Sequence, residues 1–424
     1  MSFPTIALLF LGALQAPAAT TPQIPFPVPS KLDAWLDSPG GKITFTLEVN
    51  APRGKKGGTP TFRLVNGARG EDVVQIERWE KTPESLVLHI DSYDSHLEFV
   101  DTPVGGERVG TWKKLRGPNQ WLELSLHATV RPDKPVETPP LAPPPPSIAG
   151  RWSVKFSGSA EPAVGVFMHP TADRFSGTFL TTLGDDRCLG GSYDPKAACW
   201  QFSCFDGAHA FLFKAKVQAD GSLSGDFWSG KDSHETWTAK RDDAAALPDP
   251  FGLTKSNAGV DLAKLVFTDV DGGKVSLADP KFAGKGRILQ VFGTWCPNCN
   301  DEAEFLRGLD SRWRQSGLVI VGLAFELSGN PERDLAQLKA FSARHETTYP
   351  LLLAGVADKA QASKAFPLLD AIRAYPTTIF MRADGSVLAV HQGYSGPATG
   401  EAHMKLRTDF ERLINELLTG KKSK

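Results

Sequence analysis

The chain has 424 residues, enough for two to four domains at about 100 to 200 residues each. Its 47 basic and 48 acidic residues leave a formal net charge of -1, which argues against nucleic acid or a strongly acidic surface as a partner. Five cysteines are an odd number, so at least one is unpaired or shared with another molecule.

Residues 1–18 have the pattern of a secretory signal peptide. Residues 5–14 are almost wholly apolar, and Ala16 and Ala18 are the small residues that precede a cleavage site. The apolar run is shorter than the roughly 20 residues that span a bilayer, and no nearby cysteine offers a lipid anchor. We therefore expect export to the periplasm or a similar space.

A β-rich domain is expected over residues 24–131. Short segments there alternate apolar and polar residues between turn residues, as strands do, at residues 43–49, 73–76, 86–90 and 121–126. His89, His96 and His127 stand singly among these segments. We interpret them as half-exposed strand residues and not as metal ligands.

Residues 132–147 are dense in proline and include Pro143-Pro144-Pro145-Pro146. Such runs are extended and stiff, so this segment is expected to be a linker between folded units. Attraction of a proline-binding partner is the alternative.

A second β-rich domain is expected over residues 148–247. Residues 175–179 and 223–227 echo one another, as do Gly110-Thr111-Trp112 and Gly150-Arg151-Trp152. The Gly-x-Trp opening resembles that of lipocalin-like barrels. The pattern predicts an antiparallel barrel or sandwich, and it leaves open whether the two series form two barrels or one joint sheet.

Three cysteines fall in this second series. Cys199 and Cys204 would point to opposite faces of a regular strand, so a bond between them needs a bulge, and Cys188 could pair with either. The alternative is that all three are small buried hydrophobic residues. We expect no catalytic role for them.

The remainder, residues 253–424, alternates strand-like and helix-like segments, as α/β domains do. A hairpin turns at Asp271-Gly272-Gly273. Strands are expected at residues 288–292, 318–325, 349–353, 377–382 and 387–391. Helices are expected after Cys299, after Asn330-Pro331, over residues 360–372 with an interruption at Pro367, and over residues 403–418.

The chemistry of the chain is concentrated at Cys296-Pro297-Asn298-Cys299, directly after the apolar strand at residues 288–292. This order delivers Cys296 to a helix N-terminus, where free N–H groups and the helix dipole favour a thiolate. Cys296 is therefore the predicted nucleophile. Cys299, one turn further, is suited to resolve a mixed disulfide.

Other uses of a CxxC pair fit less well. A zinc site needs a second pair of ligands, and neither a second CxxC nor a spaced histidine pair is present in the sequence. Covalent haem attachment requires a histidine after the second cysteine, where this chain has Asn300. A purely structural disulfide is possible, but a strand-to-helix elbow is a better place to react. We expect neither a metal nor a cofactor.

Residues around the pair resemble a known family. Trp295, Pro297 and Glu302 surround the cysteines, and Tyr375-Pro376-Thr377-Thr378 follows downstream. Over residues 265–418 the chain resembles the thioredoxin superfamily, specifically the exported thiol-disulfide oxidoreductases of the TlpA/ResA type. The resemblance implies that Pro376 follows a cis peptide bond and packs beside the cysteines.

Two acids are candidates for tuning the site. By the same resemblance Glu302 lies below the cysteines and handles protons; the alternative is an ordinary first-turn acid stabilised by the helix dipole. Glu326 ends the strand that follows the CxxC helix, so it is expected at the same sheet edge as the cysteines. Either it shifts their titration or it is a solvated strand-end acid.

The sequence thus predicts an enzyme, a protein-disulfide reductase that works through Cys296 and Cys299 on protein thiols and disulfides. The resemblance implies a membrane thiol carrier as reductant and apocytochrome thiols among the substrates. One alternative is a thiol peroxidase of the peroxiredoxin type, although the threonine expected three residues before the reactive cysteine is not there. Another is a β-rich binding module that targets the redox domain to one partner.

Overall fold

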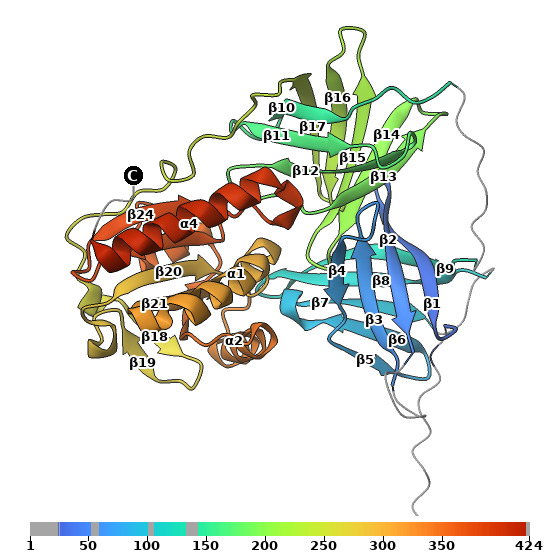
Figure 1. Ribbon diagram of the computed structural model, residues 1–424. Coiled ribbons are helices and arrows are strands. Elements are labelled where there is room, and N and C mark those ends of the chain that lie inside the picture. The colour runs from blue at the N-terminus through green and yellow to red at the C-terminus, as the bar shows by residue number, and fades with distance from the viewer. Residues whose placement is uncertain (1–23, 25, 52–58, 101–105, 133–142, 421–424) are drawn as a thin grey trace, which may run out of the picture.

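Three sheets organise the molecule. The computed structural model describes residues 24, 26–51, 59–100, 106–132 and 143–420 (Figure 1). An open nine-stranded sheet and a closed barrel form an all-β N-terminal part, and a seven-stranded mixed sheet with helices forms the C-terminal part. The expected fold class is therefore confirmed. The predicted signal peptide and residues 133–142 of the predicted linker lie outside the described residues.

The first sheet is antiparallel, in the order β4-β3-β2-β1-β9-β8-β7-β6-β5. Its edge strands are consecutive in the chain, and the residues between them bond to both sides: Ile76 N–H donates to Phe62 O and Glu77 N–H to His89 O. The sheet therefore curls back towards itself around one apolar face. Its strands are β1 Ser30–Ser38, β2 Gly41–Asn50, β3 Thr61–Asn66, β4 Asp72–Gln75, β5 Arg78–Lys81, β6 Ser85–Ile90, β7 Ser95–Val100, β8 Arg108–Gly117 and β9 Gln120–Val130, with η1 Asp91–Tyr93 between β6 and β7.

The second sheet is a closed barrel in which each strand pairs with the next and β17 returns to β10. The question of two units or one joint sheet is answered, since the barrel closes separately from the first sheet. Large aromatic side chains fill it, among them Trp152, Trp200 and Trp237. Its strands are β10 Gly150–Phe156, β11 Ala163–Met168, β12 Arg174–Leu180, β13 Leu189–Asp194, β14 Cys199–Phe205, β15 Ala210–Val217, β16 Leu223–Ser229 and β17 Ser233–Arg241.

All three cysteines of the barrel have free thiols. Cys204 belongs to the barrel core, whereas Cys188 is half-buried just before β13. Burial raises the pKa of Cys188 to about 12, and neighbouring acids act in the same direction. Of the two alternatives considered for these residues, unpaired thiols are the one found.

The third sheet has the order β19-β18-β22-β21-β20-β23-β24, and β20, β21 and β22 are parallel because helices connect them. Its apolar strands, such as β20, are buried along their whole length. Its strands are β18 Val266–Asp269, β19 Lys274–Ser276, β20 Gly286–Phe292, β21 Leu318–Glu326, β22 Leu351–Val356, β23 Thr377–Met381 and β24 Val387–Gln392.

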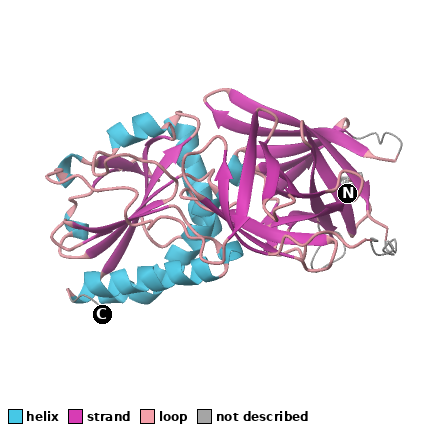
Figure 2. Ribbon diagram, turned by 90° about the horizontal axis from the view of Figure 1, so that it is seen from above, coloured by secondary structure: helices cyan, strands magenta, loops and turns pink. Residues whose placement is uncertain are grey.

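Four α-helices belong to this domain, and Figure 2 shows them gathered in this part of the molecule. They are α1 Pro297–Trp313, α2 Pro331–His345, α3 Lys359–Ala365 and α4 Glu401–Thr419, with short turns η2 Leu262–Lys264, η3 Pro280–Phe282, η4 Arg314–Ser316 and η5 Pro397–Thr399. Within the described ranges, none of the helices combines the length and apolar character needed to cross a membrane.

The helix expected over residues 360–372 is shorter than predicted. It ends at Ala365, and Phe366 leaves the helical region because the residue before a proline is disfavoured there. The Ser363 hydroxyl accepts from Ile372 N–H, and Asn257 donates to the Pro367 carbonyl. Side-chain hydrogen bonds therefore replace the helical bonds that Pro367 interrupts.

Candidate active site

The CxxC pair lies at the junction between β20 and α1, as expected. Cys296 is the N-cap of α1 and Pro297 is its first residue, where the missing N–H of proline costs nothing. The Cys299 N–H donates to Cys296 Sγ at 3.3 Å. The helix therefore presents a backbone donor to the first sulfur and places the second cysteine one turn inside.

Backbone next to Pro376 closes the other side of the pair. The Tyr375-Pro376 peptide bond is cis, and the Cys296 thiol donates to the Tyr375 carbonyl at 3.4 Å. Trp295 donates from Nε1 to the Phe325 carbonyl and meets the Tyr375 ring edge to face at 5.5 Å. The structure thus brings Trp295, both cysteines and Pro376 together.

Cys299 and Glu302 form the buried floor of this arrangement, both with no exposed surface. Glu302 accepts from Gln290 Nε2 at 2.7 Å and from the Thr378 hydroxyl at 2.6 Å. Burial raises the pKa of Glu302 to about 7, so it can change charge near neutral pH. Burial, together with the neighbouring Cys296 sulfur, raises the pKa of Cys299 well above its ordinary value.

Glu326 is buried and not solvated, so the strand-end alternative is wrong. Its carboxylate accepts from the Thr294 N–H at 3.0 Å and from the Thr294 hydroxyl at 2.7 Å. Burial raises the pKa of Glu326 to about 8. Its hydrogen bonds therefore act on the loop that leads into Cys296, and none of them goes to a sulfur.

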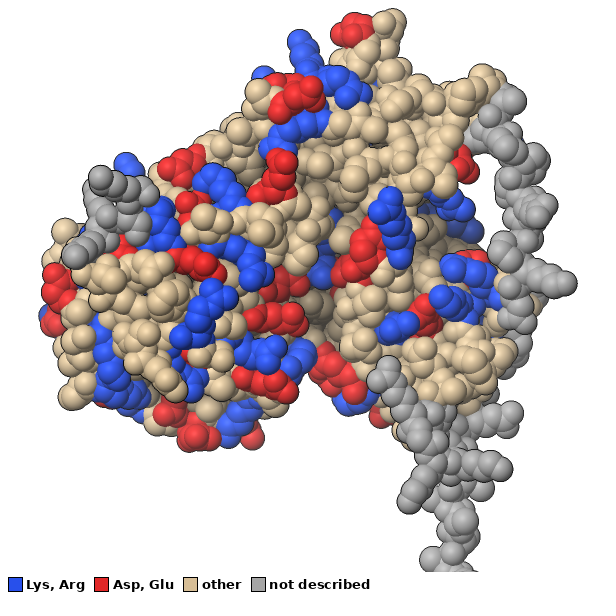
Figure 3. All heavy atoms as spheres, in the orientation of Figure 1, with Lys and Arg blue, Asp and Glu red and all other residues tan. Residues whose placement is uncertain are grey.

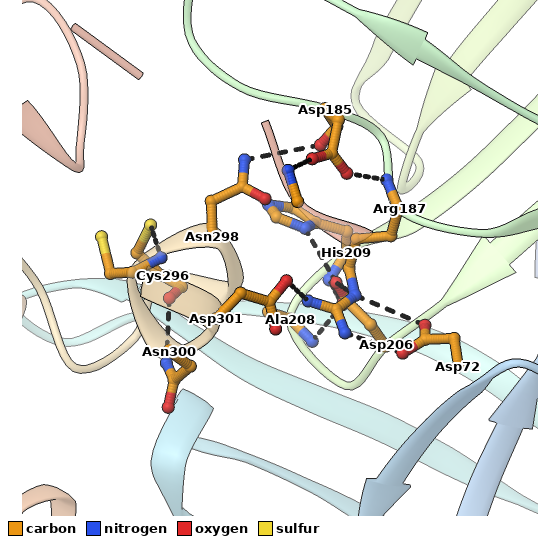
Figure 4. A network of polar contacts seen from close by, with 12 residues as sticks. Asp72, Asp185, Arg187, Asp206, Ala208, His209, Cys296, Asn298, Asn300 and Asp301 are labelled. Carbon is orange, nitrogen blue, oxygen red and sulfur yellow. Dashed lines mark hydrogen bonds and ion pairs between the residues drawn. The ribbon is translucent and has the colours of Figure 1, made fainter. Parts of the chain in front are cut away.

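Sequence reasoning missed a group of residues from the β-rich half that meets the CxxC helix (Figure 4). Arg187, just before β13, donates to Asp301 at 2.9 Å and to Asp72 at 2.7 Å, and lies 3.7 Å from Asp206. One guanidinium therefore joins all three sheets. Nothing in the local sequence distinguishes Arg187 from other arginines, so no pattern could have found it.

A lysine from the first sheet is buried in the same region. Lys114 of β8 donates to the Ala208 carbonyl at 2.5 Å. Burial lowers the pKa of Lys114 to about 8, against the raising effects of Asp206 and Cys296. The CxxC pair therefore lies within the electrostatic reach of a cation that the N-terminal half supplies.

No metal-binding group of three or more His, Cys, Asp or Glu side chains occurs among the described residues. His89 and His96 are neighbours on β6 and β7, with ring centres 5.8 Å apart. His127 instead stacks on Trp35 and bonds to Asp37 and Glu107.

Fold and site together define the C-terminal part as a thioredoxin-like domain with a CxxC pair. The model of the AhpC/TSA family matches residues 258–390. The thiol-disulfide oxidoreductase ResA of Bacillus thuringiensis subsp. konkukian is 26% identical over 151 residues, which are 36% of this chain and 79% of that protein. ResA of Bacillus subtilis is 25% identical over 142 residues, 34% of this chain and 71% of that protein.

Among solved structures, a thiol:disulfide interchange protein from Chlorobium tepidum TLS is 25% identical. The match covers 41% of this chain and 99% of that one, with a TM-score of 0.28. The resemblance of the C-terminal domain to the TlpA/ResA type is therefore supported by relatives that align with about a third of the chain.

Proposed function

We propose that the chain is a thiol-disulfide oxidoreductase that reduces protein disulfides through Cys296 and Cys299. The observation that carries this proposal is the pair itself: Cys296 Sγ sits at the N-terminus of α1, 3.3 Å from the Cys299 N–H and beside the Tyr375 carbonyl. The ResA relatives, named as thiol-disulfide oxidoreductases, support the same activity.

The two cysteines and the substrate disulfide account for all the bonds and electrons of the reaction. Cys296 thiolate attacks one sulfur of the partner disulfide, the partner S–S bond breaks, and the other partner sulfur leaves as a thiolate. Cys299, after losing its proton, attacks Cys296 Sγ and releases the second partner sulfur. Two electrons pass to the partner, two protons complete its thiols, and the chain keeps the Cys296–Cys299 disulfide.

Supporting residues have distinct parts in this scheme. A negative charge on Glu302 opposes ionisation of Cys299, so a protonated Glu302 favours the resolving step. Glu326 holds the Thr294 loop that sets the position of Cys296. An outside thiol reductant, a membrane carrier by the family resemblance, then restores the dithiol. The proposal includes export through residues 1–18.

Trapping tests the proposal. In the full chain, Cys299→Ser should accumulate a mixed disulfide between Cys296 and a reducible protein such as insulin, detected as a higher-mass species that dithiothreitol removes. Cys296→Ser is the matched control and should form none. Turnover should be lost in both variants, since each loses one of the two exchange steps. Undiminished turnover in Cys296→Ser would disprove the assignment.

The AhpC/TSA match gives one alternative, a thiol peroxidase in which Cys296 reduces hydrogen peroxide. The Thr294 hydroxyl, two residues before Cys296, donates to Glu326 and not to the sulfur, which counts against it. Hydrogen peroxide consumption by Cys299→Ser, without any mixed disulfide, would favour the peroxidase over the reductase.

A further inference from the structure

The CxxC segment lies against the β-rich half of the chain, which contacts Asn298 and Asp301 directly. Cys296 is only 6% exposed, although the sulfur of an incoming disulfide must reach its Sγ. In Figure 1 the barrel and the nine-stranded sheet both lie against the end of the C-terminal domain from which α1 starts.

The β12–β13 loop, residues 181–188 of the barrel, lies against the CxxC motif. Gln392 Nε2 donates to the Thr182 carbonyl at 2.9 Å, and Gly396 N–H donates to the Asp185 carboxylate at 2.6 Å. Asn298, inside the CxxC motif, donates to the Asp185 carbonyl at 3.5 Å. The loop thus bonds to the motif, to the last residue of β24 and to the chain just after it.

This face is the one that carries the reactive groups. Gly393, next to Gln392, donates from its N–H to the Pro376 carbonyl at 2.9 Å, so the contacted chain lies beside the cis-proline segment. The approach is close: a Cβ on Gly393 would lie 3.1 Å from the Leu183 carbonyl oxygen. A protein substrate and the β12–β13 loop would therefore compete for the same surface.

Ion pairs of Arg187 hold the C-terminal end of this loop. The Arg187 side chain is only 14% exposed, and its guanidinium bonds to Asp301, two residues after Cys299, and to Asp72 of the first sheet. In Figure 4, Arg187 lies between the CxxC helix and the strand that carries Asp72. The loop is therefore held from both ends, by Gln392 at Thr182 and by this ion pair at Arg187.

We propose that the β12–β13 loop is an intramolecular occupant of the surface on which a protein disulfide must dock, so that protein partners reach Cys296 only when the loop leaves. This inference rests on the proposed function. The partner it implies is a polypeptide segment able to take over the backbone contacts of Thr182 and Asp185. Small thiol reagents need less of this surface than a protein does.

A wedge tests the proposal without disturbing the buried charges. Gly184 has φ +152°, which strains any side chain. A Cβ there would clash with the Asn298 amide and lie 3.5 Å from the Tyr394 carbonyl oxygen, so the branched side chain of Gly184→Val should displace the loop from the motif. Gly221→Val is the matched control: this glycine also has a positive φ, +79°, but has no atom within 4 Å of a Cβ. Gly184→Ala is a smaller wedge should the valine variant fail to fold.

The readout is the access of reagents of two sizes to Cys296, in full chains that also carry Cys299→Ser. Iodoacetamide and a polymer-linked maleimide are compared, with labelling of the Cys296 peptide followed by mass spectrometry. We expect the polymer reagent to label the Gly184 variants about tenfold faster than the parent, equivalent to about 1.4 kcal/mol, and iodoacetamide to change much less. Gly221→Val should behave as the parent does.

Equal labelling by the polymer reagent in parent and folded Gly184 variants would overturn the proposal. Labelling requires no exchange with a disulfide, so the two hypotheses fail separately. If Gly184→Val with Cys299 intact exposes Cys296 but reduces no disulfide, the loop is an occupant and the proposed function is wrong. If this variant reduces insulin about tenfold faster than the parent, both the loop proposal and the proposed function are supported.

Discussion

Buried carboxylates occur in two places around α1, and their partners differ. Inside the C-terminal domain, Glu302 and Glu326 accept hydrogen bonds from neutral donors, namely Gln290, Thr378 and Thr294. At the contact between the domains, Asp72 and Asp301 bond to the guanidinium of Arg187. The same residue type therefore serves two purposes within a short distance of the cysteines.

The carboxylates with neutral partners and those with cationic partners differ in their pKa values. Burial raises the pKa values of Glu302 to about 7 and Glu326 to about 8, because neutral donors compensate little of the lost hydration. Burial alone would also raise the pKa of Asp206, but His209 and Arg187 hold it well below its ordinary value. Acids with neutral partners suit proton transfer, and acids with cationic partners suit attachment.

Asp301 stands between the two groups. Burial raises its pKa to about 7, although Arg187 acts in the opposite direction. It is the carboxylate that the CxxC helix contributes to the domain contact. The attachment of the β-rich half to the helix therefore includes one acid that titrates in the same range as Glu302.

Removing the charge of Arg187 should have the largest effect on the free energy of unfolding. Arg187→Met would leave several buried carboxylates without a charged partner, and breaking such a buried pair costs about 3–5 kcal/mol. We expect a loss of this size in the free energy of unfolding, measured with urea, and faster hydrogen exchange in residues 181–188. Arg312→Met, which breaks an exposed pair with Glu411, is the control and should cost less than about 1 kcal/mol.

Equal losses in Arg187→Met and Arg312→Met would mean that burial gives Arg187 no special part in joining the domains. The contrast between acids with neutral and with cationic partners would then lose its energetic basis.

The second prediction concerns the pH dependence of stability. The folded-state pKa of Glu302, about 7, lies above its ordinary value of 4.5, so the folded chain holds this proton more tightly. Its contribution is complete below pH 4.5 and is lost as the pH rises to about 7, roughly 3 kcal/mol in all. Glu302→Gln is neutral at every pH, so this fall should be missing from its urea unfolding curves.

The new glutamine at position 302 should fit the site. Gln290 Oε1 is buried without a partner, and it can accept a hydrogen bond from the new side-chain amide once the amide group of Gln290 turns over. Glu304→Gln, on the exposed face of the same helix, is the control and should keep the parental pH dependence. A fall of parental size in Glu302→Gln would show that Glu302 is ionised throughout and takes no part in proton handling.

The position of the CxxC pair could be predicted because its signals are local. Cys296 and Cys299 follow an apolar strand and open a helix, and this order alone puts both sulfurs at the helix N-terminus. Strands of the β-rich half were also predictable from their alternation. Their pairing was not, because closure of the barrel depends on contacts between β10 and β17, distant in the chain.

Interdomain contacts were the least predictable feature. Arg187, Asp72 and Asp301 come from a barrel loop, the first sheet and helix α1, and their meeting depends on how whole domains pack, which no local pattern encodes. Charge on the visible face does not mark the contact either: Figure 3 shows acidic and basic side chains interspersed over it. The depth of Glu326 was left open for a similar reason, since the packing around a strand end is set by distant segments.

The smallest effect is expected at Arg344, a partly exposed arginine that also links the halves. Arg344 of α2 donates to Glu77 at 3.1 Å and to Asn300 at 3.4 Å, and both members of the Arg344–Glu77 pair are partly exposed. Arg344→Met should therefore cost less than about 1 kcal/mol in urea unfolding. Asn300 keeps its bond to His345 Nε2 at 2.7 Å, so the CxxC loop should stay in place and labelling of Cys296 by iodoacetamide should be unchanged.

Arg307→Met is the matched control, because its exposed pair with Glu346 lies within the C-terminal domain. A loss in Arg344→Met as large as that in Arg187→Met would mean that the halves are held by the number of their ion pairs. The expected order, Arg187 far above Arg344 and Arg344 near Arg307, would instead assign the attachment to the better shielded ion pairs of Arg187, because solvent screens exposed pairs more strongly than buried ones.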